Sequence, residues 1–242
     1  MKRLLLSCLL AGLAADAAVA ADATPCEARS LAFGDAKSGW SHRPLSKLKR
    51  DTVYAVVQDG AGRSVLRASA DRSASLYAAL LKPMASTSAL LSWQWKTDAL
   101  VPGADNRDKS REDAPLRVLA AFDGDVATLP ADEQKRFHRA KSLAGREPPF
   151  ATLMYIWTDH VPVGTVIPSA HTSQVKMLAV ASGAAGLGSW QTVKRNLAED
   201  YRLAFGGDPG PLLGVAVMTD TDNTGAKAVG EYADVRIACG GG

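Results

Sequence analysis

Residues 90–97 read Leu-Leu-Ser-Trp-Gln-Trp-Lys-Thr, and this stretch decides the fold. Alternate side chains of an extended strand point to opposite faces, so Leu91, Trp93 and Trp95 share one face. Side chains at i and i+2 cannot share one face of a helix. The stretch therefore predicts a central β-strand, with an opposing sheet packed against its two indoles.

Shorter apolar or alternating stretches recur along the chain, separated by turns rich in Gly, Pro and Asp. Helices are expected at residues 131–144 and 197–204, and the polarity of the first suggests a surface insertion. This pattern predicts an all-β, two-sheet, jelly-roll-like sandwich with one or two short surface helices. Strands flanking the central one are expected at residues 52–57, 65–70, 75–80, 116–122, 152–158, 175–181, 212–219 and 232–238.

The N-terminus has the pattern of a signal peptide. A basic start precedes an apolar run at residues 4–15, and residues 18–20 read Ala-Val-Ala, an A-x-A cleavage site. The run is too short to span a bilayer, and no later apolar run reaches about 18 residues. We therefore predict a signal peptide at 1–20 and a single sandwich domain at 21–242. The protein is expected to be bacterial, periplasmic or secreted, and not membrane-spanning.

Two cysteines, Cys26 and Cys239, lie near the two ends of the expected mature chain. An exported chain folds in an oxidising compartment, where such a pair favours a disulfide bond. The bond would close a loop of about 210 residues and stabilise the fold by up to about 5 kcal/mol. It requires the first and last segments of the sandwich to be neighbours, with Cα atoms about 6 Å apart.

The charge of the chain is nearly balanced, with 28 Lys and Arg against 25 Asp and Glu. The basic residues are scattered, so no nucleic-acid partner is expected. The sequence contains no G-x-S-x-G elbow, no H-E-x-x-H motif and no P-loop. We assign no catalytic residue, expect no required cofactor, and lean towards a protein that is not an enzyme.

Several short motifs occur in an order that resembles a known family. They are Leu-Ser-Trp-Gln-Trp at 91–95, Glu-Asp-Ala-Pro-Leu-Arg-Val at 112–118, Phe-Asp-Gly at 122–124, Met-Tyr-Ile-Trp at 154–157, Arg-Asn-Leu-Ala-Glu-Asp-Tyr at 195–201, Phe-Gly at 205–206 and Val-Met-Thr-Asp-Thr-Asp-Asn-Thr-Gly at 217–225. Together they resemble the bacterial domain-of-unknown-function family 3047 across nearly all of the mature chain. That resemblance implies kinship and export rather than a chemistry.

The order of the elements and an early Gly-Trp at residues 39–40 also resemble a second group. They look like the galactose-binding-type sandwiches found in carbohydrate-binding modules. This second likeness is one of fold, and a fold does not fix a function.

Four tryptophans, Trp93, Trp95, Trp157 and Trp190, are candidates to offer flat apolar faces to sugar rings. Large aromatic residues at alternating strand positions mostly fill a core, and this interpretation is favoured for the first three. Trp190 follows the glycine-rich stretch 183–188, so it is the better candidate for an exposed ring.

Three charged residues are further candidates for ligand contact: Arg117, Arg195 and Asp200. Arg117 stands mid-strand among apolar neighbours, where a buried guanidinium group needs an acidic partner. A structural ion pair is the favoured interpretation, and a cation in a binding groove is the alternative.

The sharpest metal motif is the loop that begins at Asp220. Counting this residue as position 1 places Asp222 at 3, Thr224 at 5 and Glu231 at 12, which is the spacing of a calcium loop. The flanks, however, read as strands rather than helices. The favoured alternative is a hairpin loop whose Asp and Asn side chains hydrogen-bond their own backbone, and any bound Ca²⁺ would be structural.

These observations favour an exported, non-enzymatic module that binds a carbohydrate or envelope glycan. One rival is a hydrolase that acts on envelope polysaccharide through loop carboxylates such as Asp113, Asp220 and Asp222. The other rival is a structural envelope protein without a small ligand. The oligomeric state stays open.

Overall fold

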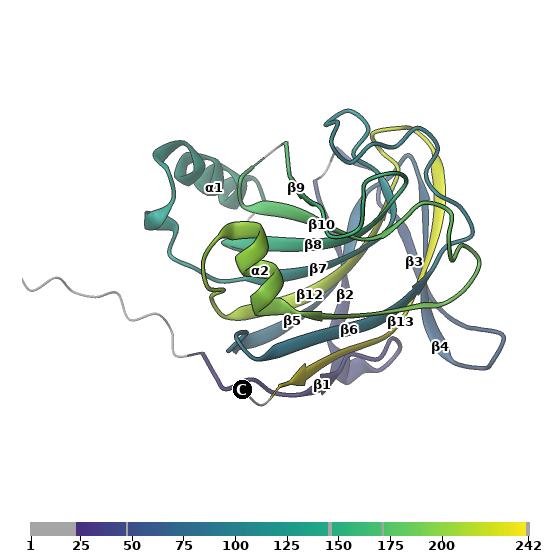
Figure 1. Ribbon diagram of the computed structural model, residues 1–242, viewed down its shortest axis with the longest axis horizontal. Helices are drawn as coiled ribbons and strands as arrows, with labels where there is room; N and C mark the ends of the chain where they lie inside the picture. Colours follow the sequence, from purple (N-terminus) through teal and green to yellow (C-terminus); the bar gives the residue numbers. More distant parts are fainter. Residues whose placement is uncertain (1–22, 47, 145–146, 171, 241–242) are drawn as a thin grey trace, which may run out of the picture.

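The computed structural model describes residues 23–46, 48–144, 147–170 and 172–240, and the predicted signal peptide lies outside them. The described chain folds into two β-sheets stacked face to face (Figure 1). With only two short α-helices among these residues, the structure confirms the predicted two-sheet sandwich.

Sheet B has six strands, and the strand with the two tryptophans, β6, lies inside it. Its order is β11-β6-β13-β4-β3, and β1 pairs with β13. All of its pairs are antiparallel. The strands are β1 (Arg29–Ser30), β3 (Val53–Gln58), β4 (Ser64–Asp71), β6 (Ala89–Lys96), β11 (Gln191–Asn196) and β13 (Lys227–Cys239).

Sheet A has seven strands in the order β2-β5-β12-β7-β8-β10-β9. β8 and β10 run parallel, while the other neighbouring pairs run antiparallel. The strands are β2 (Trp40–Pro44), β5 (Ser75–Met84), β7 (Ala114–Phe122), β8 (Ala151–Thr158), β9 (Val166–Pro168), β10 (Val175–Ser182) and β12 (Leu212–Asp220).

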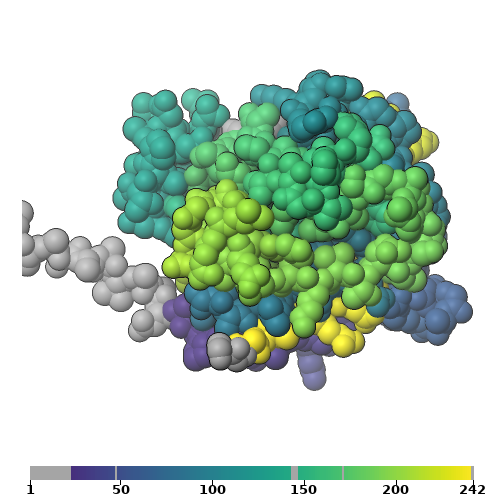
Figure 2. All heavy atoms as spheres, viewed as in Figure 1, coloured from purple at the N-terminus to yellow at the C-terminus, as the bar shows by residue number. Residues whose placement is uncertain are grey.

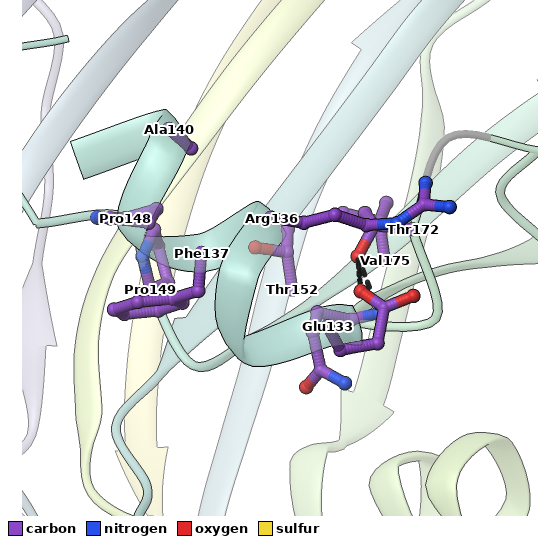
Figure 3. A pocket seen from close by; sticks show the side chains of 10 residues that line it. Glu133, Arg136, Phe137, Ala140, Pro148, Pro149, Thr152, Thr172 and Val175 are labelled. Atoms are coloured by element: carbon purple, nitrogen blue, oxygen red, sulfur yellow. Dashed lines mark hydrogen bonds between the residues drawn. The ribbon is translucent and has the colours of Figure 1, made fainter. Parts of the chain in front are cut away.

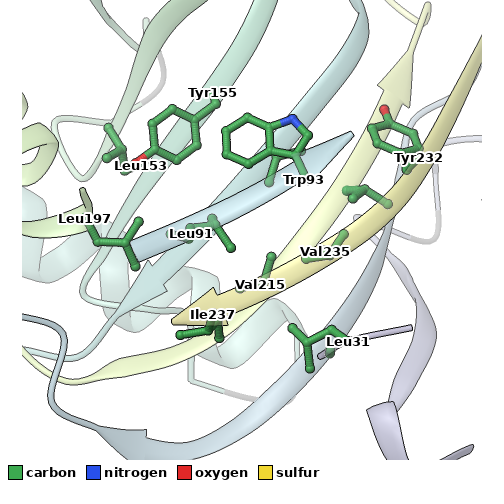
Figure 4. Packing of buried hydrophobic residues seen from close by; sticks show 14 of the residues in the cluster. Leu31, Leu91, Trp93, Leu153, Tyr155, Leu197, Val215, Tyr232, Val235 and Ile237 are labelled. Atoms are coloured by element: carbon green, nitrogen blue, oxygen red, sulfur yellow. The ribbon is translucent and has the colours of Figure 1, made fainter. Parts of the chain in front are cut away.

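The inner faces of both sheets bury their apolar side chains in one core. Trp93 and Trp95 of β6 are at most 1% exposed. The Trp93 ring centroid lies 5.1 Å from that of Tyr155, and the Trp95 centroid lies 6.2 Å from that of Trp157, so β6 contacts β8 across the sandwich. Figure 4 shows Trp93 beside Tyr155 within this core. The strand predicted for the two tryptophans is therefore confirmed.

The two helices, α1 (Ala131–Ala144) and α2 (Leu197–Phe205), match the predicted ranges to within one residue. The Asn196 side chain caps α2 by accepting hydrogen bonds from amides of its first turn, and Gly206 ends it with φ +85°. α2 packs into the core through Leu197, whereas α1 lies outside sheet A (Figure 1). None of the helices in the described ranges is long and apolar enough to cross a membrane.

The two ends of the sandwich domain are fastened together, as the cysteine positions predicted. Cys26 and Cys239 form a disulfide bond with a Cα–Cα distance of 5.9 Å. β1 follows Cys26 and pairs with the end of β13, where Arg29 lies opposite Ile237 (Figure 1). The first and last strands are therefore neighbours.

Four strands were not expected from the sequence: β1, β2, β9 and β11. β1, β2 and β9 have two to five residues, too few for a clear alternation, and β11 has a single apolar residue, Val193. β2, β9 and β11 are edge strands, so each pairs with one neighbour alone. The chain also contains two unexpected 3-10 turns, Ala36–Ser38 and Val126–Thr128.

Candidate functional site

Three of the four candidate tryptophans are parts of the core rather than of a surface. Trp93, Trp95 and Trp157 are each at most 1% exposed, so none can present a ring face to a ligand. The core interpretation favoured by their alternation is confirmed, and their role as candidate ligand contacts is corrected. Trp190 is half-buried and is the one candidate indole with an accessible part.

Trp190 lies at the start of β11, above the outer face of sheet B. The preceding loop is pinned to the end of β6 by a hydrogen bond of 2.9 Å from the Gly188 amide to the Thr97 carbonyl. The Arg63 guanidinium carbon lies 4.5 Å from the indole centroid, and the Lys96 ammonium lies 5.6 Å from it. These cation–π contacts hold the ring against the sheet.

A row of polar side chains crosses the sheet beside this indole. One Arg63 nitrogen donates to Gln94 Oε1 at 2.5 Å and to Asp234 Oδ2 at 2.6 Å. The Gln94 amide then donates to Thr192 Oγ1 at 3.2 Å. These residues come from four adjacent strands or their ends, and we call them, with Trp190, the Trp190 surface. A hollow lined by Gln94, Thr192 and Asp234 lies within it.

Asp234 reaches this surface because β13 is irregular at that point. The register between β13 and β6 shifts between Ala233 and Arg236, which marks a β-bulge. Asp234 itself has φ +50°, a conformation that non-glycine residues adopt infrequently. Bulges re-aim side chains and occur often beside functional sites. Asp234 at this bulge accepts a hydrogen bond from Arg63, which lies over the indole, so an uncommon backbone conformation occurs beside the Trp190 surface.

Arg117 is a buried structural cation, as the favoured interpretation predicted. Its side chain is 1% exposed, and its Nε donates to Asp220 Oδ1 at 2.7 Å. The other guanidinium nitrogens contact the Glu112 carbonyl and the sulfur atoms of Met154 and Met177. The guanidinium group is therefore used within the protein and does not line a binding groove.

Burial raises the pKa of Asp220 to about 6, although Arg117 opposes the shift. The folded chain then holds a proton on this carboxyl group at a pH where the unfolded chain has released it. The stabilisation that this proton gives is fully present below 3.8, the pKa of the group in the unfolded chain, and is lost as pH rises through about 6. Because of this group, we expect the free energy of unfolding to fall by about 1 kcal/mol as the pH rises from 5 to 7.

Urea unfolding of the wild type and of Asp220→Asn at several pH values measures this contribution. The variant carries no titrating group at this position, so its stability should fall less between pH 5 and pH 7. Identical pH slopes in the two proteins would show that the pKa of Asp220 lies near its usual value.

Arg195 and Asp200 also form an ion pair, which joins the two sheets at the α2 end of the sandwich. Arg195 Nε donates to Asp200 Oδ2 at 2.8 Å, and the Tyr155 hydroxyl group donates to the same oxygen at 3.0 Å. Asp200 is 3% exposed. Arg195 belongs to β11 of sheet B and Tyr155 to β8 of sheet A, so Asp200 links the two sheets. The favoured interpretation, a structural ion pair, fits Arg195 and Asp200.

The predicted calcium ligands come together only in part. Oxygens of Asp220 and Asp222 lie within 4.8 Å of each other and of a third carboxylate, Asp113. Glu231 lies outside this group because it belongs to β13, where its Oε2 is 2.8 Å from the Lys96 ammonium. The predicted twelfth-position ligand, Glu231, is therefore not near Asp220 and Asp222, which corrects that part of the calcium-loop prediction.

Each of the three carboxylates already has a donor or a cation beside it. Asp113 accepts from the Thr224 amide at 2.7 Å and the Thr224 hydroxyl group at 2.6 Å. Lys49 lies 2.5 Å from Asp222, and Arg117 holds Asp220. Two cations already lie among these three carboxylates, so a calcium ion, which takes six to eight oxygen ligands, would have to compete with them. The hydrogen-bonded loop, the favoured alternative, describes these contacts.

Comparisons with known proteins give a family and distant structural neighbours. The family described as "Protein of unknown function (DUF3047)" matches residues 38–236. The search of curated proteins found no match.

Among solved structures, the chain is similar to the xyloglucanase domain of NopAA, a type three effector from Sinorhizobium fredii in complex with cellobiose. The identity is 11%, the match covers 83% of this chain and 94% of that chain, and the TM-score is 0.40. The chain is also similar to a family 30 carbohydrate binding module, with 10% identity and a TM-score of 0.35. That match covers 82% of this chain and 99% of the module. An exo-beta-agarase has 11% identity, 87% and 24% coverage and a TM-score of 0.38.

Proposed function

The chain belongs to the DUF3047 family, and we propose that it is an exported, non-catalytic module whose Trp190 surface binds a carbohydrate. One observation carries the proposal: a half-buried indole, held by two cations, lies beside a row of hydrogen-bonding side chains. The disulfide bond between Cys26 and Cys239 supports export, because such bonds persist in oxidising compartments.

A sugar ring needs two kinds of contact, and the Trp190 surface offers both. Its axial C–H groups pack on a flat aromatic face, and its hydroxyl groups need donors and acceptors around the edge. Asp234 is about one-third exposed and its carboxylate has acceptor capacity beyond the bond from Arg63. Gln94 adds an amide, and Thr192 a hydroxyl group, at neighbouring positions.

Binding is favoured over hydrolysis because the candidate loop carboxylates are engaged. Glycoside hydrolysis needs two carboxyl groups that both reach the scissile bond. Asp113 and Asp220 are 1% and 3% exposed. Both accept hydrogen bonds from the protein itself, and Asp222 is paired with Lys49.

A glycan array probed with the protein produced from residues 21–242 tests the proposal. We expect retention on at least one polysaccharide, and Trp190→Ala should weaken it about 30-fold, corresponding to about 2 kcal/mol of lost contact. Leu203→Ala is the matched control, because Leu203 is a 59% exposed apolar residue on another element.

Three outcomes would overturn the proposal. Release of reducing ends from a retained polysaccharide would favour the hydrolase. Retention that Trp190→Ala leaves unchanged would place the ligand elsewhere. Failure to bind any glycan on the array would favour a structural envelope protein.

A further inference from the structure

The outer face of sheet A carries an apolar trough that the proposed glycan site does not use. Ala78 of β5, Ala216 of β12 and Leu119 of β7 lie in one row across three adjacent strands. Their side chains point away from the main core and are 7–8% exposed. A hollow of about 230 Å³ lies above them.

Small residues make the floor of this trough low. Ala216 pairs with Ala78 on one side and with Leu119 on the other. Gly214, two residues earlier on β12, approaches the neighbouring strand so closely that a Cβ atom there would lie 2.7 Å from the Ala79 carbonyl. Alanine and glycine thus leave room where larger side chains would fill the space.

The wall of the trough is formed by α1 together with Pro148 and Pro149. Figure 3 shows Phe137 and Ala140 of α1 with Pro148 and Pro149 around a second hollow of about 310 Å³. The two hollows share Ala140, Pro148, Pro149 and Thr152, so they lie side by side. In the space-filling view, α1 stands out from the body of the sandwich on this side (Figure 2).

One cation, Arg43, and one carboxylate, Glu147, line this apolar space, and Glu147 is paired with Lys141 at 3.1 Å. Arg43 of the edge strand β2 lines the trough opposite Leu76. Its Nε is buried but has no hydrogen-bond partner among the described residues. Since Arg43 lines the hollow, a carboxylate placed there could form charge-assisted hydrogen bonds with its guanidinium group.

We propose that this trough binds a single-chain anionic amphiphile, with its aliphatic chain over the alanine floor and its carboxylate on Arg43. The apolar floor suits methylene groups, whose burial away from water is favourable. The floor offers no aromatic ring and few hydrogen-bonding groups, so it does not suit a sugar. The ligand is a dissolved monomer of the fatty-acid class rather than a membrane surface.

Titration calorimetry with dodecanoate, kept below its micelle concentration, tests the proposal on the protein produced from residues 21–242. We expect saturable binding of one dodecanoate per chain. Arg43→Gln should weaken dodecanoate binding about tenfold and leave binding of 1-dodecanol unchanged, since the alcohol has no charge. Ala216→Phe should abolish the binding of both by filling the floor.

A second variant keeps the test informative if Ala216→Phe fails to fold. Leu80 lines the same trough and is 59% exposed, so Leu80→Glu is expected to fold and to weaken dodecanoate binding. Leu203→Ala, on α2, is the control and should bind like the wild type.

Several results would overturn the proposal: no binding by the wild type, equal binding by all variants, or tight binding of dioleoylphosphatidylglycerol vesicles without binding of dodecanoate. Dimerisation of the wild type that Ala216→Phe abolishes would also contradict it, because a second copy would then occupy the trough.

Discussion

Removal of the Cys26–Cys239 disulfide bond is expected to lower the free energy of unfolding by about 5 kcal/mol. The two cysteines are 213 residues apart, so the bond closes nearly the whole described chain into one loop in the unfolded state. A loop of this length restricts the unfolded chain strongly, and its loss restores that conformational freedom. Stability of native domains is commonly about 5–15 kcal/mol, so the double variant should be marginally folded.

Urea unfolding of the double variant Cys26→Ser with Cys239→Ser, compared with the wild type, measures this effect. The reduced wild type is the control and should match the variant, because both lack the bond while the rest of the chain is shared. A loss smaller than about 1 kcal/mol would show that the paired strands β1 and β13 hold the ends together without the bond.

Replacement of Arg117 by Met is expected to destabilise the fold by about 3–5 kcal/mol at pH 7. The change leaves Asp220, which is 3% exposed, without the cation that opposes the burial of its charge. Met has a similar length and no charge, so the loss reflects the ion pair and the hydrogen bonds rather than a large cavity. The pKa of Asp220 should rise further in the variant, because burial then acts without Arg117.

The pH dependence separates this cause from simple loss of packing. The variant should lose more stability at pH 8 than at pH 5, since the protonated carboxyl group needs no counter-ion. Lys49→Met is the matched control: it removes the cation from Asp222, but the Lys49 side chain is 43% exposed. A cost below about 1 kcal/mol is expected for such a surface pair. Equal losses in the two variants would contradict a special role for Arg117.

The sandwich could be predicted because most of its strands have a recognisable local sequence pattern. The alternation in β6 placed Leu91, Trp93 and Trp95 on one face, and these residues fill the core. The cysteine positions required neighbouring ends, and β1 pairs with β13. In both cases the contacts in the folded chain agree with the local sequence pattern.

The Trp190 surface could be predicted only in part. The glycine-rich stretch before Trp190 suggested exposure, and the alternation of β6 places Gln94 on the outer face. Arg63 and Asp234, however, are 171 residues apart and meet because β4 pairs with β13. The bulge that turns Asp234 towards the surface leaves no mark in an alternating pattern.

The calcium-loop spacing placed Glu231 in the loop because a linear count ignores where a strand begins. β13 starts at Lys227, five residues before the predicted strand, so Glu231 lies within the sheet. There it faces Arg67 and Lys96 in the strand registers rather than the loop at Asp220. Sheet pairing, not loop geometry, decides the position of this side chain.

The claim that glycan binds over Trp190 is tested most directly by hydroxyl-radical footprinting with the polysaccharide that the array retains best. We expect saturating polysaccharide to slow the oxidation of Trp190 several-fold and to leave Leu80, on the opposite outer face, unchanged. An unchanged rate at Trp190 together with protection of Leu80 would contradict the claim, because the ligand would then occupy the trough on sheet A.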